Sequence, residues 1–213
     1  MGCTVNGVSK RLCGRVILDN VSAVFSPAQV SGIVGVNGSG KTMLMRTIAG
    51  LARPDSGTVT IDGDVLFRDV SFPPSVGALI ENPAFIGARS GYDNLMLLAR
   101  IKGLIGPDEV RAVLDEVGLG DAGKLKFSKY SLGMKQRLGL AAAVMENPRL
   151  LLLDEPSNAL DASGVEMLKR LVRKSRDSGA TVIIASHDML LIEELSDRMF
   201  SMEAGHIAEI DRG

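Results

Sequence analysis

The stretch Gly35-Val36-Asn37-Gly38-Ser39-Gly40-Lys41-Thr42 fits the phosphate-binding loop pattern G-x-x-x-x-G-K-[ST]. Residues 30–34 before it form a short apolar run, typical of a buried strand, and apolar residues recur at helical spacing after it, up to Leu51. The pattern binds phosphate in this strand, loop and helix context. The stretch therefore predicts a nucleotide site in an α/β fold, and a chance glycine turn is the weaker alternative.

Each residue type in this loop has a physical role. Glycines let successive backbone N–H groups point at one anion, and the positive end of the following helix dipole strengthens the attraction. We expect the Lys41 ammonium to reach the β- and γ-phosphates and the Thr42 hydroxyl to ligate Mg²⁺. The residues expected to hold the nucleotide are Gly35, Asn37, Gly38, Ser39, Gly40, Lys41 and Thr42.

Four leucines at 150–153 run directly into two carboxylates, Asp154 and Glu155. Such a run predicts a strand buried on both faces of a parallel sheet, and α/β folds place ligands at the carboxyl ends of these strands. We expect Asp154 to lie on the Mg²⁺ side and Glu155 to polarise a water as general base. The alternative is an acid pair that only caps the next helix.

Three further segments follow in the order found in a known family. Residues 130–137 read Y-S-L-G-M-K-Q-R, residues 158–161 read N-A-L-D, and His187 follows the apolar run 181–185. With the two motifs above, the chain resembles an ATP-binding cassette (ABC) nucleotide-binding domain over essentially its whole length. The resemblance implies an α/β P-loop core with a mostly parallel sheet, an antiparallel β part and an inserted helical subdomain.

The resemblance also implies roles for residues outside the loop. Ser131 and Gly133 would contact the γ-phosphate held by a second ATP-binding subunit, most simply in a homodimer around two ATP molecules with Mg²⁺. His187 would be the switch histidine, acting in catalysis with Lys41 and Glu155. Without the resemblance, Ser131 is a good helix N-cap, and a lone histidine after a strand is more often structural.

Two departures from the general family pattern stand out. Glu81 occupies a position that usually holds glutamine, and together with Leu132 and Met134 in the 130–137 segment it resembles the bacitracin and lantibiotic export and self-protection branch. A carboxylate carries charge and cannot donate unless protonated, so we expect Glu81 to join Thr42 and Asp154 as a metal-binding residue and to change the metal occupancy there. Leu12 stands where the family usually has an aromatic side chain against adenine, which predicts weaker or less base-selective ATP binding.

Composition narrows the class of protein. The chain has 213 residues, 46% of them hydrophobic, which argues against general disorder, and a net charge of −1, which argues against nucleic-acid binding. Its two cysteines are compatible with a reducing cytosol, and no apolar run reaches the roughly 18 residues of a membrane helix. A local basic group is read mainly as a solvated face; it comprises Lys124, Lys126, Lys129, Lys135 and Arg137.

We expect a single domain over 1–213, with the helical subdomain at approximately 82–145. Strands are predicted at 16–25, 58–61, 76–80 and 181–185, and helices at 94–101 and from about 106 onward, where Pro107 suits an early helical position. A hairpin is predicted over 198–202 and 207–210, with His206 in its turn.

The functional expectation is an ATP-hydrolysing transporter subunit that drives a separate membrane permease. The branch resemblance implies export of an antimicrobial peptide or drug. It would be cytoplasmic and peripheral on the inner face of the cell membrane, with residues 82–85 as candidate contacts and Phe85 as either their anchor or a core residue. The alternative is a soluble non-transport ABC ATPase. A binding-only regulatory module is disfavoured by the intact Lys41, Asp154, Glu155 and His187.

Overall fold

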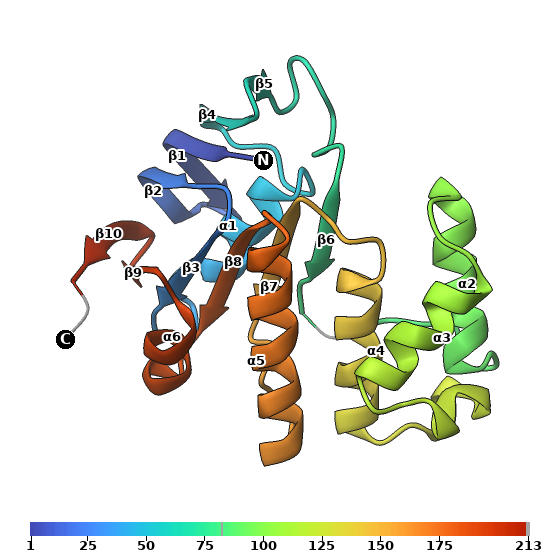
Figure 1. Cartoon of the computed structure of the whole chain (residues 1–213). Coiled ribbons are helices and arrows are strands. Elements are labelled where there is room, and N and C mark those ends of the chain that lie inside the picture. The colour runs from blue at the N-terminus through green and yellow to red at the C-terminus, as the bar shows by residue number, and fades with distance from the viewer. Residues whose placement is uncertain (82, 212–213) are drawn as a thin grey trace.

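A six-stranded sheet forms the centre of the computed structural model, which describes residues 1–81 and 83–211 (Figure 1). Its strand order is β10-β9-β3-β8-β7-β6, and all neighbouring pairs are parallel except β10 with β9. The bounds are β3 Gln29–Val34, β6 Val76–Leu79, β7 Leu150–Asp154, β8 Thr181–Ser186, β9 Arg198–Glu203 and β10 His206–Ile210. The expected mostly parallel sheet is confirmed.

The leucine run of β7 explains how this sheet divides the core. All five residues of β7 are buried, and so are all six of β8. Leu150 and Leu152 join one hydrophobic cluster, whereas Leu151 and Leu153 join the other. Because strand side chains alternate between faces, the run is apolar throughout only when both faces are covered.

One face of the sheet is covered by α1 and by a second, antiparallel sheet. Helix α1 spans Lys41–Ile48, and the second sheet has the order β2-β1-β4-β5, with β1 Cys3–Leu12, β2 Arg15–Phe25, β4 Ser56–Ile61 and β5 Asp64–Val65. This sheet is the expected antiparallel part. Strand β1 was not predicted, because its register with β2 shifts repeatedly and interrupts the period-2 alternation of apolar residues.

The other face is covered by α5 (Ala162–Asp177) and α6 (Met189–Leu195), which lie in front of the sheet in Figure 1. The side chain of Asp161 accepts a 2.8 Å hydrogen bond from Gly164 N, which caps the start of α5. Met167, Leu168, Leu171 and Val172 form the buried stripe of this amphipathic helix.

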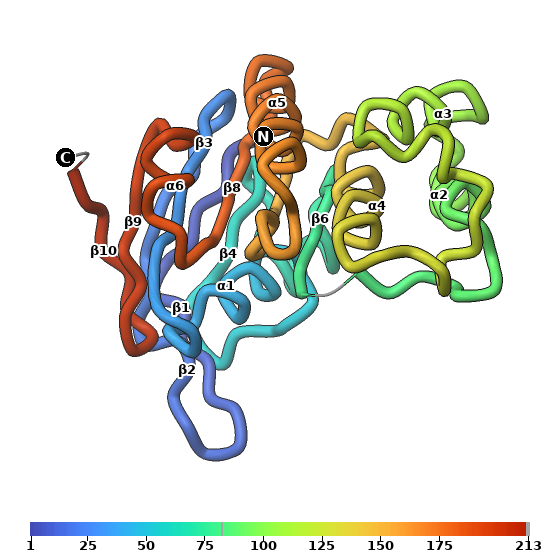
Figure 2. Tube along the Cα trace, turned by 90° about the horizontal axis from the view of Figure 1, so that it is seen from below, coloured from blue at the N-terminus to red at the C-terminus, as the bar shows by residue number. Residues whose placement is uncertain are grey.

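A group of helices stands to one side, between β6 and β7 in the chain (Figure 2). It comprises α2 Gly91–Lys102, α3 Pro107–Glu116, the 3₁₀ turns Asp121–Lys124 and Phe127–Lys129, and α4 Leu132–Val144. These elements fall within the expected 82–145 subdomain, but position 82 lies outside the described residues and the boundary stays a prediction. Within the described part, no helix has the length and apolar character needed to cross a bilayer.

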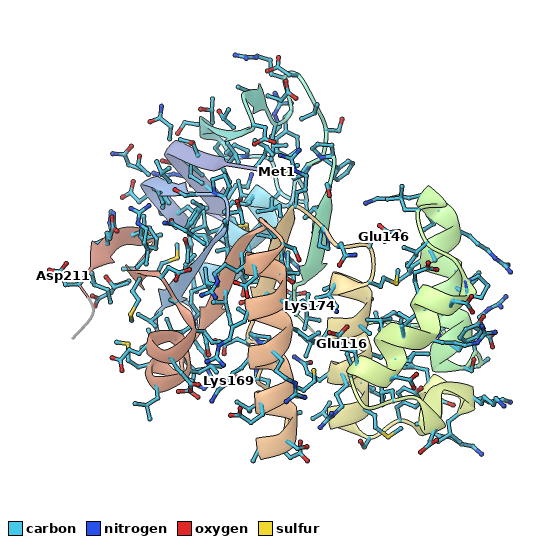
Figure 3. All side chains as sticks on the ribbon, in the orientation of Figure 1. Met1, Glu116, Glu146, Lys169, Lys174 and Asp211 are labelled. Carbon is cyan, nitrogen blue, oxygen red and sulfur yellow. The ribbon has the colours of Figure 1, made fainter. Side chains whose placement is uncertain are left out.

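Two contacts fix the outer helices. Asn94, a buried residue of α2, anchors the segment that precedes this helix. Its side chain accepts a hydrogen bond from Ile86 N at 2.9 Å and donates one to Ile86 O at 3.2 Å. Lys174 of α5 and Glu116 of α3, both labelled in Figure 3, form an ion pair of 2.8 Å between the core and the helical group.

Three predictions need correction or refinement. His206 is the first residue of β10 rather than a turn residue, because Ala204 and Gly205, both at positive φ, make the turn. Phe85 is half-buried and packs edge-on against Phe127 at 5.3 Å, so it belongs largely to the core. In the basic group, Arg137 is bound within the fold, where it donates 2.9 and 3.0 Å hydrogen bonds to Val117 O and Asp161 Oδ1.

The contact between α4 and β6 depends on Gly77. A Cβ there would overlap the carbonyl oxygen of Ala143 and lie 2.7 Å from Cγ of Pro148. We therefore expect Gly77→Ala to lower the free energy of unfolding by about 1–3 kcal/mol, measured by urea unfolding followed by circular dichroism. Gly87→Ala is the matched control, because its Cβ would meet only Ser128 Cβ at 3.7 Å. Equal stability of the two variants would contradict this account of the contact.

Candidate functional site

The loop between β3 and α1 has the shape that its glycines allow. Gly38 and Gly40 have φ of 83° and 114°, in the left-handed region that glycine adopts without strain. Gly35 lies against the next hairpin, where an added Cβ would come within 2.7 Å of Ser39 Oγ and closer still to the Met202 carbonyl. The backbone can therefore approach a bound anion only with glycine at these positions.

The side chain of Lys41 lies inside this loop and is only 5% exposed. Its Nζ donates to the carbonyl oxygens of Gly35 and Val36, at 2.5 and 3.2 Å, and lies 3.6 Å from Glu155 Oε1. An ammonium group has three donors and no acceptor, so it can bind only oxygen atoms such as those of this loop. This is the geometry expected of a residue that binds phosphate oxygens.

Thr42 and Asp154 meet at the start of α1 and the end of β7. The Thr42 hydroxyl donates a 2.6 Å hydrogen bond to Asp154 Oδ2. The other oxygen of this carboxylate, Oδ1, is buried and has no hydrogen-bond partner among the described residues. Burial raises the pKa of Asp154 above its usual value, and the Thr42 hydrogen bond offsets only part of that effect. A buried oxygen without a donor and a nearby hydroxyl suit an oxygen-liganded cation.

Glu155 lies beside these groups and is linked to the next strand. Its N–H donates to Ala185 O of β8 at 2.8 Å, and its φ of 48° turns the chain sharply at the strand end. The carboxylate oxygen Oε2 lies 2.8 Å from His187 Nδ1 and accepts from Ser186 Oγ at 3.2 Å. The other oxygen, Oε1, is buried and without a hydrogen bond within the described ranges. Lys41, Glu155 and His187, predicted to act together, therefore lie together.

Glu81 reaches the same place from β6. It lines a cavity of about 290 Å³ with residues of the loop and α1, with Ile17 and with Glu155. Its Oε2 lies 2.8 Å from the Arg46 guanidinium on α1. Arg46 was not singled out in the sequence, although it stands four residues after Thr42 and so on the same helix face.

Leu12 is the expected nucleotide contact that lies farthest from this arrangement. It is the last residue of β1, 52% exposed, near the tip of the β1–β2 hairpin that projects in Figure 2. It does not line the cavity, whereas Ile17, on the returning strand, does. Ile17 gave no motif signal, since an apolar residue in a strand usually belongs to the core.

Ser131 and Gly133 line a different hollow. Ser131 caps α4 by accepting from Met134 N at 3.2 Å, as predicted, and a Cβ on Gly133 would lie 2.9 Å from Ala159 O. Their hollow of about 360 Å³ is shared with Arg137 and Asp161, and none of its lining residues lines the cavity at the loop. Within one chain, these residues and the phosphate-binding loop form separate sites.

The acidic groups alone do not make a metal cage. Throughout residues 1–81 and 83–211, His, Cys, Asp and Glu side chains form no cluster of three suited to a metal ion. Mg²⁺ usually takes one or two protein ligands and completes its shell with substrate phosphates and waters. Thr42 and Asp154 fit that requirement.

Comparison with known proteins identifies the family of the chain. The family model described as ABC transporter matches residues 18–158. The uncharacterised ABC transporter ATP-binding protein YybJ of Bacillus subtilis is 40% identical over 95% of this chain and 93% of its own length. The bacitracin transport ATP-binding protein BcrA of Enterococcus faecalis is 37% identical over 95% of this chain, which spans 66% of that relative. The lantibiotic transport ATP-binding protein SrtF of Streptococcus pyogenes is 34% identical, with 91% and 83% covered.

Solved structures show the same fold. An ATP-binding subunit of an ABC transporter superposes with a TM-score of 0.90 at 23% identity, covering 99% of this chain and 90% of the other. An ATP-binding cassette, solved as a dimer in a post-hydrolysis state with ADP and Pi, gives 0.89 at 23% identity, covering 99% of both chains. The chain therefore belongs to the ABC transporter family, as one of its ATP-binding proteins.

Proposed function

We propose that this chain, an ABC-type ATPase subunit, hydrolyses MgATP in the cavity at the phosphate-binding loop, with Glu155 as general base. The observation that carries the proposal is that the two Glu155 carboxylate oxygens differ in their hydrogen bonds. Oε2 is held by His187 and Ser186, whereas buried Oε1 has no hydrogen-bond partner in the described structure. A carboxylate held on one side, with its other oxygen lacking a hydrogen bond and 3.6 Å from the Lys41 ammonium, is arranged to accept a proton from water.

Nucleotide binding would begin at the loop. The backbone N–H groups at the start of α1 and the ammonium of Lys41 would surround the phosphates, and the helix dipole would favour their negative charge. Lys41 would exchange its hydrogen bonds to Gly35 O and Val36 O for phosphate oxygens. Thr42 and Asp154 would hold Mg²⁺, which supplies charge neutralisation of the β- and γ-phosphates when bound.

Hydrolysis would then need a water placed in line with the γ-phosphate. Glu155 Oε1 would take one proton from this water while the water oxygen bonds to the γ-phosphorus. The bond between the γ-phosphorus and the β-phosphate oxygen would break, and ADP would leave. An ionised carboxylate only accepts hydrogen bonds, so His187 Nδ1 must donate to Oε2. His187 thereby fixes the orientation of the base.

The separate hollow at Ser131 and Gly133 supports a dimer. Since no lining residue is shared with the loop cavity, we infer that a γ-phosphate bound by one chain would meet Ser131 and Gly133 of a second subunit. We propose a homodimer in which the capped start of α4 from each copy closes the loop cavity of the other.

Glu155→Gln tests the catalytic assignment. The amide keeps the size of the side chain but is a poor base, so ATP should still bind while turnover falls by about 10²- to 10⁴-fold. Turnover is measured by phosphate release and binding by equilibrium fluorescence with a labelled ATP analogue. Glu166→Gln is the matched control, because this exposed acid pairs with Lys169 on α5 and does not line the cavity. Near-wild-type turnover in pure Glu155→Gln would remove Glu155 from the mechanism.

The adenine prediction is tested at Leu12. Leu12→Tyr should tighten ATP binding by on the order of 1 kcal/mol, about fivefold in Kd, and sharpen the preference for ATP over GTP, because a ring at this hairpin could stack on the base. Val24→Tyr, at a 50% exposed position on β2, controls for a non-specific effect of an added ring. If both variants bind like the unaltered protein, adenine is held elsewhere, with Ile17 the nearest candidate.

The relatives' names point to the partner and cargo. Because BcrA is named for bacitracin transport and SrtF for lantibiotic transport, we propose that this chain drives a membrane permease from the cytoplasmic face, with an antimicrobial peptide as cargo. The permease would contact the helical group near Glu81. Of the predicted contacts, Asn82 lies outside the described residues and Phe85 packs largely in the core. Four apolar side chains between β6 and α3 are exposed: Ile86, Leu98, Ile101 and Leu104.

Ile101→Asp tests this contact. Ile101 is 77% exposed near the end of α2, so the substitution should leave folding and ATP binding intact. Recovery of the chain with native membranes should fall by at least threefold, because a charge placed in an apolar contact is costly. Leu190→Asp, equally exposed on α6, is the control. If the unaltered protein is never recovered with a membrane protein, the soluble ABC ATPase becomes the better account.

A further inference from the structure

Arg46 gives the nucleotide cavity a second cation that the loop motif does not include. It lies one helical turn after Thr42 on α1 and lines the same cavity as Lys41 and Glu155. Its guanidinium is 2.8 Å from Glu81 Oε2, with side-chain exposures of 40% and 54% for the two partners. The pair therefore stands at the mouth of the cavity, where it is neither buried nor fully solvated.

The sheet register explains why Glu81 is there. Leu79 of β6 is paired with Leu153 of β7, so Glu81 and Glu155 each stand two residues beyond the same rung. Both have positive φ, 63° and 48°, a conformation that costs non-glycine residues about 1–3 kcal/mol unless their surroundings hold it. Glu155 is held by β8, His187 and Ser186. The side-chain interaction that the structure gives Glu81 is with Arg46.

Charge gives this contact a consequence for the nucleotide. Two carboxylates, Glu81 and Glu155, line the cavity, and a third, Asp154, lies behind its lining residue Thr42; the triphosphate expected there is itself negative. Lys41 offsets one of them. Without Arg46, Glu81 would add an uncompensated negative charge on the side where the phosphates and their cation must bind.

We propose that Arg46 is the positioning residue for Glu81: their ion pair holds this carboxylate at the cavity mouth and sets how strongly ATP binding depends on Mg²⁺. The inference rests on the proposed MgATP site. It assigns to α1 a role beyond the loop motif. The same helix would carry Thr42, whose hydroxyl faces Mg²⁺, and Arg46, whose cation restrains Glu81.

The test is a double-mutant cycle read by binding rather than by turnover. The measured quantity is the ratio of the Kd of a fluorescent ATP analogue in EDTA to its Kd in saturating Mg²⁺, for the full chain at low salt. Arg46→Gln should raise this ratio about fivefold, because unpaired Glu81 repels metal-free ATP most. Glu81→Gln should lower it by a similar factor, because freed Arg46 then faces the phosphates.

The remaining variants distinguish a specific effect of the Arg46–Glu81 ion pair from a general effect of net charge on nucleotide binding. Arg46→Lys should stay within about twofold of the unaltered protein, since it keeps the cation. The double variant should return close to the unaltered ratio. Arg68→Gln, which removes the cation of an exposed pair with Asp69 outside the cavity, should change nothing. If Arg46→Gln fails to fold, Arg46→Lys and Glu81→Gln still test the role of the pair.

Two results would overturn the inference. One is an unchanged Kd ratio in Arg46→Gln or Glu81→Gln, and the other is an Arg46→Lys variant whose Kd ratio shifts as far as that of Arg46→Gln. These outcomes differ from failure of the proposed function. If the unaltered chain does not bind the ATP analogue at all, the MgATP site itself is wrong; if it binds but the variants do not shift the ratio, only the role of Arg46 is lost.

Discussion

Burial of β7 on both faces is the constraint on which the rest of the molecule depends. Alternate leucines of this strand enter different hydrophobic clusters, so α1 and the antiparallel sheet must cover one face, and α5 and α6, together with α4, the other. The same parallel pairing brings the ends of β6, β7 and β8 to one edge. Carboxylates and a histidine would lose their hydration if they were buried inside the sheet. They lie instead just beyond its strand ends, next to the loop after β3.

Much of this could be predicted from the sequence, for physical reasons. The loop motif and the leucine run combine a strong local pattern with a topology that leaves little choice about where their polar ends meet. Strand β1 was missed because bulges break its alternation, and His206 was misplaced by a single position at a turn. Arg46 could not be found in this way, because an arginine on an exposed helix face has no distinctive pattern until its partner is known.

The separate position of Ser131 shows where single-chain reasoning ends. Its capping role follows from local chemistry and is visible in one copy. Its proposed nucleotide role would depend on the loop of a second subunit, and no spacing along the chain encodes the distance between two molecules. Leu12 differs from Ser131, because its exposed position near the tip of a hairpin follows from how β1 pairs with β2.

The contacts of Lys41 with Gly35 O and Val36 O bear on how the protein waits for substrate. The ammonium occupies the middle of the loop and holds it open in the shape that phosphate needs. The conformational entropy of the loop is then lost on folding rather than on encounter with the nucleotide, which favours tight binding. In the proposed binding mode, arrival of the nucleotide would exchange the acceptors around one cation, and the loop would already have its binding shape when nucleotide is scarce.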